Sequence, residues 1–493
     1  MSQNSTYKEI KMANIKFFSG ENIPLEMHKV RMVQRIHLLP IEARVERMAR
    51  AGYNTFLLRN TDIFLDMLTD SGVNAMSEKQ YAAMLQADDS YAGSETFFRL
   101  EAVLTDIFGM KHFLPAHQGR ACEHIISQAL VRPDTFVLMN YHFTTTKAHI
   151  TRLGGTVLEL IGDEGLNIRS DKAFKGDMDI DKLKDAIKKY GKEKISFLRL
   201  EAGTNLIGGQ PISMQNIRDV SAICKSAGIK LVFDASLLSD NLYFIKKLDP
   251  QYKDADIKDI THEIAALVDV IYFSSRKLGA ARGGGILLSD DELFMKMREM
   301  VPLFEGFLTY GGMSVREMEA MAVGLQETLD FDVISQTPIF VEALCNELMS
   351  KGIPVVTPPG GLGCHVDAGQ FCSHLPQTQY PSGALASAIF IASGVRGMER
   401  GTISEQRNAD GSEHLADMEL VRLAMPKRVF TLSQVKYTAD RIGWLFQNRS
   451  LIGGLKFVEE PNVMRFFLGR LEPIGNWPEE LIKQYRRDFG DSL

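Results

Sequence analysis

A lysine that follows an apolar run is the residue of this sequence best suited to chemistry. In YFSSRKLGAARGGG, residues 272–285, Lys277 comes after two serines and before a glycine-rich stretch. Small side chains leave backbone N–H groups free to bind an anion where the chain turns. A lysine at such a turn could pair with phosphate, form a Schiff base with a carbonyl, or point into solvent. This segment alone leaves all three interpretations open.

A carboxylate closes a second apolar run. Asp234 lies in FDAS, residues 233–236, where a lone aspartate most often caps the helix that follows. Pyridoxal phosphate needs a carboxylate that keeps its ring nitrogen protonated, so that the ring can accept electrons, and a lysine that binds it covalently. The pair formed by Asp234 and Lys277, each at the end of a predicted strand, therefore indicates a pyridoxal phosphate site more specifically than either residue alone.

Two further segments offer groups for a phosphate and a planar ring. Gln118, Gly119 and Arg120, within PAHQGRACEHI at 115–125, precede a predicted helix and could donate hydrogen bonds to phosphate at its N-terminus. Phe143, within HFTTT at 142–146, could stack on a planar ring, or it could pack in the core.

The elements that must position these residues form an alternating pattern between residues 110 and 290. Short apolar runs at 135–140, 156–161, 195–200, 230–235, 269–274 and 284–289 are separated by amphipathic segments such as 179–191 and 214–228. This pattern predicts an α/β fold with a mostly parallel sheet covered on both faces. Ligands of such sheets bind beyond the carboxyl ends of the strands, and the candidate residues follow the runs.

Composition places the chain among globular proteins of several domains. It has 493 residues, 45% of them hydrophobic, and 56 basic against 62 acidic residues give a net charge of −6. An acidic chain is a poor candidate for sequence-independent nucleic-acid binding. The most apolar stretch, 384–395, is shorter than the ~20 residues that cross a bilayer. We therefore expect neither nucleic acid nor membrane as a partner.

Cysteine usage and the N-terminus predict a cytoplasmic protein. The five cysteines are an odd number and form no C-x-x-C pair, which argues against a disulfide framework. The first residues, 1–11, are polar and contain no apolar signal segment. The scattered histidines do not form a metal-ligand pattern, so no metal site is predicted.

Many motifs, in collinear order from about residue 24 to 470, resemble the tyrosine phenol-lyase and tryptophanase family of β-eliminating lyases. They include YAGSETFFRLE, HQGRACEHI, YHFTTTKAHI, GTNLIGGQPISM, FDAS, SSRK, YGGM, GVRGMERG, ELVRLAMPKRV and MRFFLGR. The resemblance implies a fold-type-I, aspartate aminotransferase-like enzyme that binds pyridoxal 5′-phosphate and assembles as a homotetramer, a dimer of dimers. The expected organisation is a loose arm at 1–20, an N-terminal segment at 21–75 that joins the small domain and the substrate site, a large cofactor domain at 76–330 and a small domain with a tail at 331–493.

The same resemblance assigns the cofactor residues. Lys277 would bind the cofactor as a Schiff base and abstract the substrate Cα proton, while Asp234 would bind the ring nitrogen and Phe143 would stack on the ring. Asn205 would lie near the cofactor's phenolic oxygen. The phosphate cradle would consist of Gln118, Gly119, Arg120 and Ser274, and Arg276 stands where the family has a second lysine.

For the substrate, the resemblance favours tyrosine over tryptophan. Arg422 would bind the α-carboxylate, with Thr69 and Ser71 nearby, because arginine binds carboxylates in a bidentate way. Thr144 and Arg400 match the threonine and arginine that handle a phenol hydroxyl, where the tryptophanase branch has an aspartate and an apolar residue. Tyr91 matches the general acid for the leaving group. Phe466 and Phe467 match an aromatic pair that closes over the substrate ring.

Three positions depart from the family pattern. Leu237 replaces an arginine beside the cofactor's phenolic oxygen, Arg282 replaces the asparagine of a monovalent cation site, and Asp89 replaces that site's glutamate. We expect Arg282 to pair with Asp89 and take the place of the cation, the alternative being that Arg282 points to solvent. The predicted activity is β-elimination of L-tyrosine or a substituted tyrosine. The alternatives are another β-substituted amino acid, a diverged pyridoxal phosphate reaction, or an inactive lyase-like scaffold.

Overall fold

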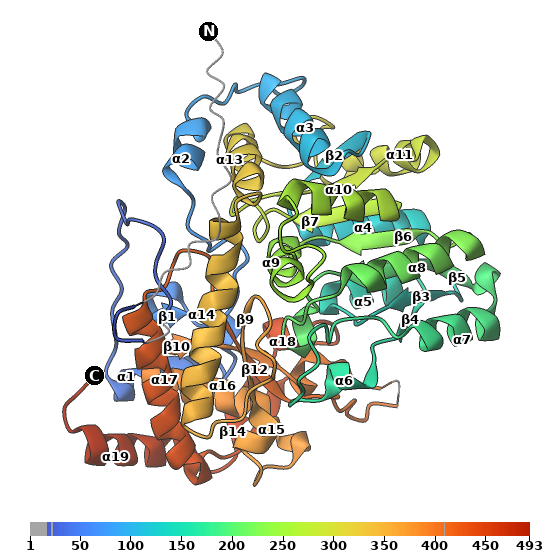
Figure 1. Ribbon diagram of the computed structural model, residues 1–493. Helices are drawn as coiled ribbons and strands as arrows, with labels where there is room; N and C mark the ends of the chain where they lie inside the picture. The colour runs from blue at the N-terminus through green and yellow to red at the C-terminus, as the bar shows by residue number, and fades with distance from the viewer. Residues whose placement is uncertain (1–16, 21–22, 409) are drawn as a thin grey trace.

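A seven-stranded sheet forms the centre of the larger part of the molecule (Figure 1). The computed structural model describes residues 17–20, 23–408 and 410–493, so most of the arm expected at 1–20 lies outside the described residues. The strand order is β2-β8-β7-β6-β5-β3-β4. The strands are β2 (His112–Ala116), β3 (Phe136–Met139), β4 (Thr156–Glu159), β5 (Ile195–Glu201), β6 (Leu231–Asp234), β7 (Val270–Ser274) and β8 (Gly284–Leu288).

Five neighbouring strands run parallel, and β8 lies antiparallel between β7 and β2. Helices cover both faces, because the strand side chains pack into two separate hydrophobic clusters. One face packs on α4 (Gly119–Leu130), α5 (Thr144–Arg152), α11 (Asp291–Arg298) and α12 (Val301–Phe304). The other packs on α3 (Glu95–Phe108), α7 (Ile180–Tyr190), α8 (Met214–Ala227), α9 (Leu238–Leu248), α10 (Ile257–Leu267) and α13 (Val315–Glu327). The predicted α/β class is confirmed.

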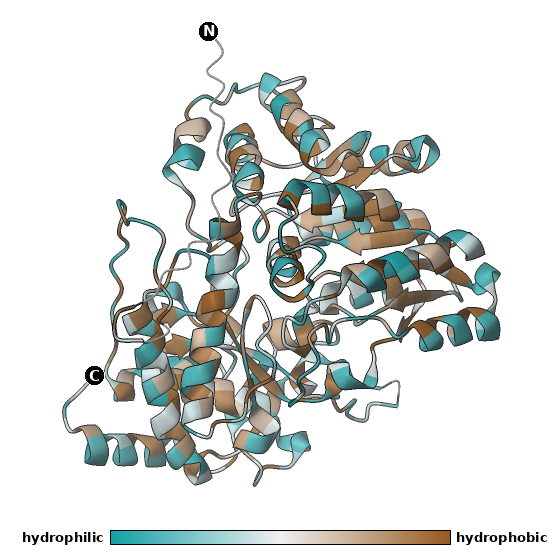
Figure 2. Ribbon diagram, in the orientation of Figure 1, coloured by the Kyte–Doolittle hydropathy of each residue, from teal (hydrophilic) through white to brown (hydrophobic). Residues whose placement is uncertain are grey.

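The apolar runs of the sequence are the strands β3 to β8, which are brown in Figure 2 between helices whose outward faces are teal. The edge strand β2 was not predicted. It contains Pro115 and begins at His112, and proline is confined to edges and bulges of sheets because it has no N–H to donate.

A second hydrophobic core joins the two ends of the chain. It packs α1 (Ile41–Arg50) with α14 (Phe331–Ser350), α16 (Pro381–Ser393), α17 (Leu432–Gln447) and α19 (Trp477–Phe489) around a three-stranded antiparallel sheet. That sheet has the order β11-β12-β9, with β9 (Gly363–Asp367), β11 (Met398–Arg400) and β12 (Leu420–Ala424). Every residue of α16 is buried, as expected for the most apolar stretch of the sequence.

Short elements complete the fold. β1 (Leu65–Asp66) pairs with β10 (Val395–Arg396), so the N-terminal segment is hydrogen-bonded to the small domain. β13 (Leu455–Glu459) pairs with β14 (Arg470–Pro473). The remaining helices are α2 (Glu78–Met84), α6 (Asp163–Leu166), α15 (Ala368–Phe371) and α18 (Arg465–Leu468). Within the described residues, none of the helices is both long and apolar enough to cross a membrane.

Candidate active site

The carboxyl ends of five strands bring the candidate residues to one edge of the central sheet. Gln118 follows β2, Phe143 follows β3 and Asn205 follows β5, while Asp234 and Ser274 are the last residues of β6 and β7. Parallel strands end at the same edge, so the sheet itself assembles these groups from distant parts of the sequence.

Lys277 lies in the turn after β7, next to an aromatic ring. Its backbone N–H donates to the carbonyl of Ser274 at 3.0 Å, which fixes the turn. Its ammonium nitrogen lies 5.5 Å from the ring centre of Phe143, and the guanidinium carbon of Arg400 lies 5.8 Å from the same centre. The two sheets therefore both contribute to the surroundings of Phe143, because Lys277 follows β7 of the seven-stranded sheet and Arg400 is the last residue of β11 in the three-stranded sheet.

An anion-binding corner lies beside Lys277. Gly119 begins α4 and packs directly on Ser274, where a Cβ would come within 2.9 Å of the serine Cβ. Arg120 and Arg276 form no ion pair within the described part of the chain, and the buried hydroxyl of Ser275 has no hydrogen-bond partner there. Burial and the nearby cations Arg282 and Arg120 lower the pKa of Arg276. Repelling cations at a helix N-terminus suit a phosphate dianion.

Asp234 is held as a buried carboxylate by three donors. The backbone N–H of Ser236 donates to Oδ1 at 2.9 Å, and the hydroxyl of Tyr272 donates to Oδ2 at 2.8 Å. The guanidinium of Arg199 donates to Oδ2 at 2.5 Å. Burial raises the pKa of Asp234, but Arg199 and the hydrogen bonds from Ser236 and Tyr272 outweigh it, so the pKa lies below its ordinary value.

Arg422 of β12, in the three-stranded sheet, reaches a residue that follows β5 of the seven-stranded sheet. It donates to Asn205 Oδ1 at 2.6 Å and to the carbonyl of Leu68 at 2.8 Å, and burial lowers its pKa to about 10. Leu68 directly precedes Thr69, whose hydroxyl accepts from the N–H of Ser71 at 3.1 Å. The three residues predicted to bind a carboxylate thus lie together, and the Nε of Arg422 has no partner within the described residues.

Arg400 is buried without a hydrogen-bonding environment. Its Nε and Nη1 have no partner within the described chain, and the same holds for the buried hydroxyl of Thr144, the residue after Phe143. Burial lowers the pKa of Arg400 to about 9. Its guanidinium carbon lies 5.9 Å from the ring centre of Phe466, which packs 3.9 Å from that of Phe467. Buried donors without acceptors cost about 1–3 kcal/mol each, so a ligand oxygen is expected here.

These groups fit pyridoxal phosphate. Phe143 offers an aromatic face beside Lys277, and Asp234 is an ionised carboxylate for a protonated ring nitrogen. The Asn205 side-chain N–H₂ is buried without a partner in the described residues, so it remains available to an acceptor such as the phenolic oxygen. Leu237, buried against Gly203 nearby, offers no charge there.

Two sequence expectations are not met within one chain. The ring of Tyr91 is 74% exposed and packs on Phe307 and Tyr310 at 5.8 and 5.5 Å, and no contact among the described residues joins it to Lys277. The predicted pair of Arg282 with Asp89 is wrong, because each of the two side chains faces an oppositely charged residue of α13 instead.

Arg282 and Asp89 each face a residue of α13 instead. Arg282 lies 3.8 Å from Glu317, and Asp89 lies 3.7 Å from Arg316; both side chains are mostly exposed. Arg282 follows a turn that directs its side chain to the surface, which agrees with the alternative that it points to solvent.

Sequence reasoning missed three buried polar residues of this region. Arg199 and Glu201 lie in β5, and the signal for them was two charged residues in the otherwise apolar run ISFLRLE. His365 of β9 is the register partner of Arg422. Its Nδ1 contacts the carbonyl of Gly363 at 3.0 Å, its Nε2 has no described partner, and burial together with Arg422 lowers its pKa to about 3.

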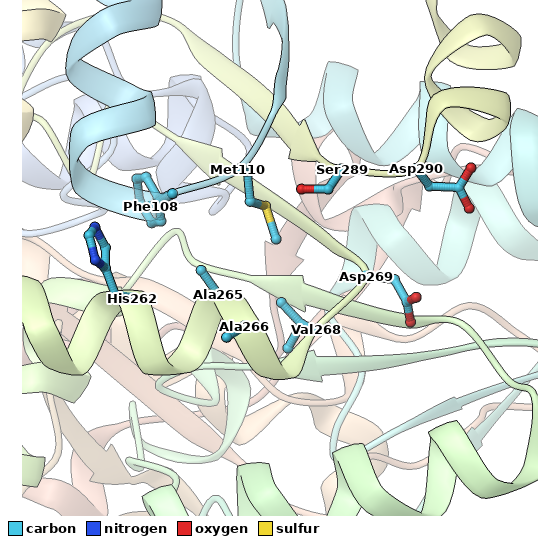
Figure 3. A pocket seen from close by; sticks show the side chains of 10 residues that line it. Phe108, Met110, His262, Ala265, Ala266, Val268, Asp269, Ser289 and Asp290 are labelled. Atoms are coloured by element: carbon cyan, nitrogen blue, oxygen red, sulfur yellow. The ribbon is translucent and has the colours of Figure 1, made fainter.

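A separate hollow of about 400 Å³ lies at the opposite edge of the sheet (Figure 3). Its lining includes Phe108, Met110, His262, Val268 and Asp290, which precede β2 and β7 or follow the antiparallel β8. It is therefore remote from Asp234 and Lys277. The described residues contain no group of three or more histidine, cysteine or acidic side chains arranged to hold a metal ion.

Comparison with known proteins gives a match to the β-eliminating lyase family over residues 66–441. Among curated relatives, the tyrosine phenol-lyase of Pasteurella multocida is 43% identical over 454 residues, which cover 92% of this chain and 99% of the relative. The tyrosine phenol-lyase of Lacrimispora saccharolytica is 42% identical over 463 residues, covering 93% and 98%.

Solved structures resemble the chain in fold at low identity. The threonine aldolase of Leishmania major has a TM-score of 0.55 and 15% identity, covering 78% of this chain and 99% of that one. The serine palmitoyltransferase of Sphingomonas wittichii has a TM-score of 0.55 and 12% identity, covering 78% and 88%.

Proposed function

The chain belongs to the β-eliminating lyase family, and on that premise we propose that it splits L-tyrosine, or a ring-substituted tyrosine, into a phenol, pyruvate and ammonia. The expected resemblance and the fold-type-I class are confirmed, and the enzyme is a pyridoxal phosphate-dependent β-eliminating lyase. The substrate and the role of each residue are the proposal.

One observation carries the choice of substrate. Arg400 and Thr144 hold buried donors without partners in the described chain, next to the ring of Phe143 and the pair Phe466 and Phe467. A phenol brings a flat ring for the aromatic side chains and one oxygen for these donors. An indole has no oxygen, so a leaving indole would leave the guanidinium unpaired.

The roles of the side chains follow from where each group lies. When bound, pyridoxal phosphate supplies the electron sink that stabilises negative charge at the substrate's Cα. In this proposal Arg422 binds the α-carboxylate, and Lys277 Nζ removes the Cα proton. Arg400 and Thr144 orient the phenol oxygen. The Cβ–ring bond then breaks, the ring carbon takes up a proton, and water converts the three-carbon remainder to pyruvate and ammonia.

The proton for the ring carbon is assigned to Tyr91, which requires a second copy of the chain. Tyr91 is exposed and has no described contact with Lys277 in its own chain. We therefore propose a homotetramer built from dimers, in which Tyr91 of one subunit serves the site of another. Mixed oligomers of Tyr91→Phe and Lys277→Ala chains test this, since complementation should restore about a quarter to a half of the sites.

We also propose that the enzyme works in the cytoplasm. All five cysteines are free and buried, which suits a reducing compartment.

The experiment that tests the proposed substrate is product analysis. Protein loaded with pyridoxal phosphate is incubated with L-tyrosine, and phenol, pyruvate and ammonia are quantified. Equal amounts of all three support the proposal. Pyruvate from S-substituted cysteines but none from tyrosine would overturn it in favour of a carbon–sulfur lyase.

A further inference from the structure

A buried ion network lies behind Asp234, on the same face of the sheet. Glu201 of β5 and Tyr272 of β7 are the register partners of Asp234 on its two sides. Arg199 stands two residues before Glu201 on the same strand, and alternate residues of a strand share a face. All four side chains are therefore directed into one layer, where Arg199 is the single guanidinium between two carboxylates.

The bonds of this network converge on one oxygen of Asp234. Arg199 donates from Nη2 to Asp234 Oδ2 at 2.5 Å and from Nε to the hydroxyl of Tyr272 at 2.8 Å. That hydroxyl donates in turn to the same Oδ2 at 2.8 Å. The second carboxylate, Glu201, accepts from Arg199 Nη1 at the longer distance of 3.3 Å. Arg199 is thus paired first with Asp234 and second with Glu201.

Burying three charged side chains costs free energy, which suggests a functional role for them. The Arg199 side chain is 1% exposed, and those of Asp234 and Glu201 are 7% and 6% exposed. Burying a guanidinium and two carboxylates gives no net stability over apolar residues of the same volume. Burial raises the pKa of Glu201 to about 7, whereas Arg199 helps to keep that of Asp234 below its ordinary value. Arg199 therefore stabilises the ionised form of Asp234 more than that of Glu201.

We propose that Arg199 is a positioning residue for the cofactor: by holding Asp234 as a carboxylate, it keeps the shared proton on the cofactor's ring nitrogen. This inference rests on the assignment of Asp234 in the proposed function. Arg199 has no role in the substrate binding proposed above.

The direction of the effect follows from distance. A positive charge lowers the proton affinity of every nearby base, and Coulomb energy falls with separation. Arg199 contacts Asp234 directly at Oδ2, so its charge acts most strongly on that carboxylate and less on a ring nitrogen that the carboxylate would bind. The carboxylate therefore loses more proton affinity than the nitrogen does, and the proton stays on the nitrogen. Glu123, Glu201, Lys277 and Arg400 are further charged groups that act on this layer, and they are present with or without Arg199.

The test is the ¹⁵N chemical shift of the cofactor's ring nitrogen, which separates protonated from unprotonated pyridine without any turnover. Apoprotein is loaded with ring-¹⁵N pyridoxal phosphate in a Glu201→Gln background, where removal of Arg199 does not leave two buried carboxylates together. Glu201→Gln alone and Glu201→Gln with Arg199→Lys are expected to show the protonated shift. Arg199→Met or Arg199→Gln in that background, whichever folds, is expected to show the unprotonated shift.

The outcomes separate this inference from the function on which it rests. A protonated shift after loss of the Arg199 charge, or an unprotonated shift in the lysine variant, would overturn the inference alone. Failure of the unmodified protein to form a borohydride-stable adduct at Lys277 would overturn the proposed site itself.

Discussion

The cofactor side and the substrate side of the site satisfy their polar groups in different ways. On the cofactor side, Asp234 accepts from three donors and Arg199 reaches two carboxylates and a phenol, all within the chain. On the substrate side, Arg400 is as deeply buried, yet two of its nitrogens have no described partner. The network around Asp234 is internally paired, whereas Arg400 keeps donors free for a ligand.

The difference between the Asp234 network and the Arg400 donors indicates which of these groups gains hydrogen bonds when the substrate binds. An internally paired network fixes the position and charge of Asp234, the group that we propose binds the cofactor's ring nitrogen. Unpaired buried donors instead cost stability in the empty protein and gain their partners only from the substrate, which is how a site rejects molecules that lack the matching oxygen.

Replacing Lys277 removes the residue that we propose binds the cofactor and takes the Cα proton. Lys277→Ala should lower tyrosine cleavage by roughly 10⁴-fold, because proton transfer by a positioned side chain is worth up to that factor. It should also abolish the borohydride-stable adduct, detected by mass spectrometry of peptides. The exposed Lys253→Ala serves as the control and should change neither. An adduct on another lysine would contradict the site.

Arginine-to-methionine changes on the two sides should shift stability in opposite directions. Arg199→Met leaves Asp234 and Glu201 buried without a cation and should destabilise the apoprotein by about 3–5 kcal/mol. Arg400→Met removes a buried cation whose Nε and Nη1 have no hydrogen-bond partner among the described residues, and it should stabilise the apoprotein by about 1–3 kcal/mol. Denaturant unfolding measures both. If Arg199→Met and Arg400→Met destabilise the apoprotein equally, the proposed difference in how the two arginines are paired is wrong.

Arg422→Met should impair binding of the substrate carboxylate. A buried charge pair that loses one partner costs about 2–5 kcal/mol, so kcat/KM for tyrosine should fall by roughly 30-fold to 4,000-fold. Arg422→Lys should recover part of the loss, because it keeps the charge but not the bidentate geometry. A carboxylate-free amine should bind both variants as it binds the unmodified protein, and weaker binding would indicate a general collapse of the site.

Arg400→Ala should discriminate between leaving groups. Elimination of phenol should suffer by about 1–3 kcal/mol, or roughly 10–100-fold, more than elimination of a small thiol from an S-substituted cysteine. The ratio of the two kcat/KM values in the variant and the unmodified enzyme gives the number. The same loss on both substrates would mean that Arg400 has a structural or carboxylate-binding role.

The smallest effect concerns a contact between the two domains. Burial lowers the pKa of His142, but its partners Glu159 and Glu405 outweigh burial and raise it, with Lys147 opposing them. A raised histidine pKa gives stability that is complete below about pH 6.5 and is lost as the pH rises through the folded-state value. His142→Gln should flatten this loss by about 1 kcal/mol between pH 6 and pH 9 in urea unfolding. If the dependence of the unfolding free energy on pH is unchanged in His142→Gln, the His142 contact does not contribute to it.

Much of the cofactor side was predictable from the sequence, because strand ends are marked by apolar runs. Lys277, Asp234 and Phe143 each follow such a run, and the sheet brings them to one edge. The ion network was not predictable, since Arg199 and Glu201 interrupt a run only once each and their partner Asp234 is distant in sequence. Tyr91 could not be located in a site from one chain, because its own chain leaves it on the surface.

The unpaired donors of Arg400 and Thr144 should select a phenol as the leaving group. The most direct measurement is the ratio of kcat/KM for L-tyrosine to that for L-tryptophan, with phenol or indole and pyruvate quantified together. We predict a ratio above about 10², because the site leaves Arg400 unpaired when the leaving group has no oxygen. A ratio near or below one, with indole and pyruvate released in equal amounts, would show that these donors do not select a phenol.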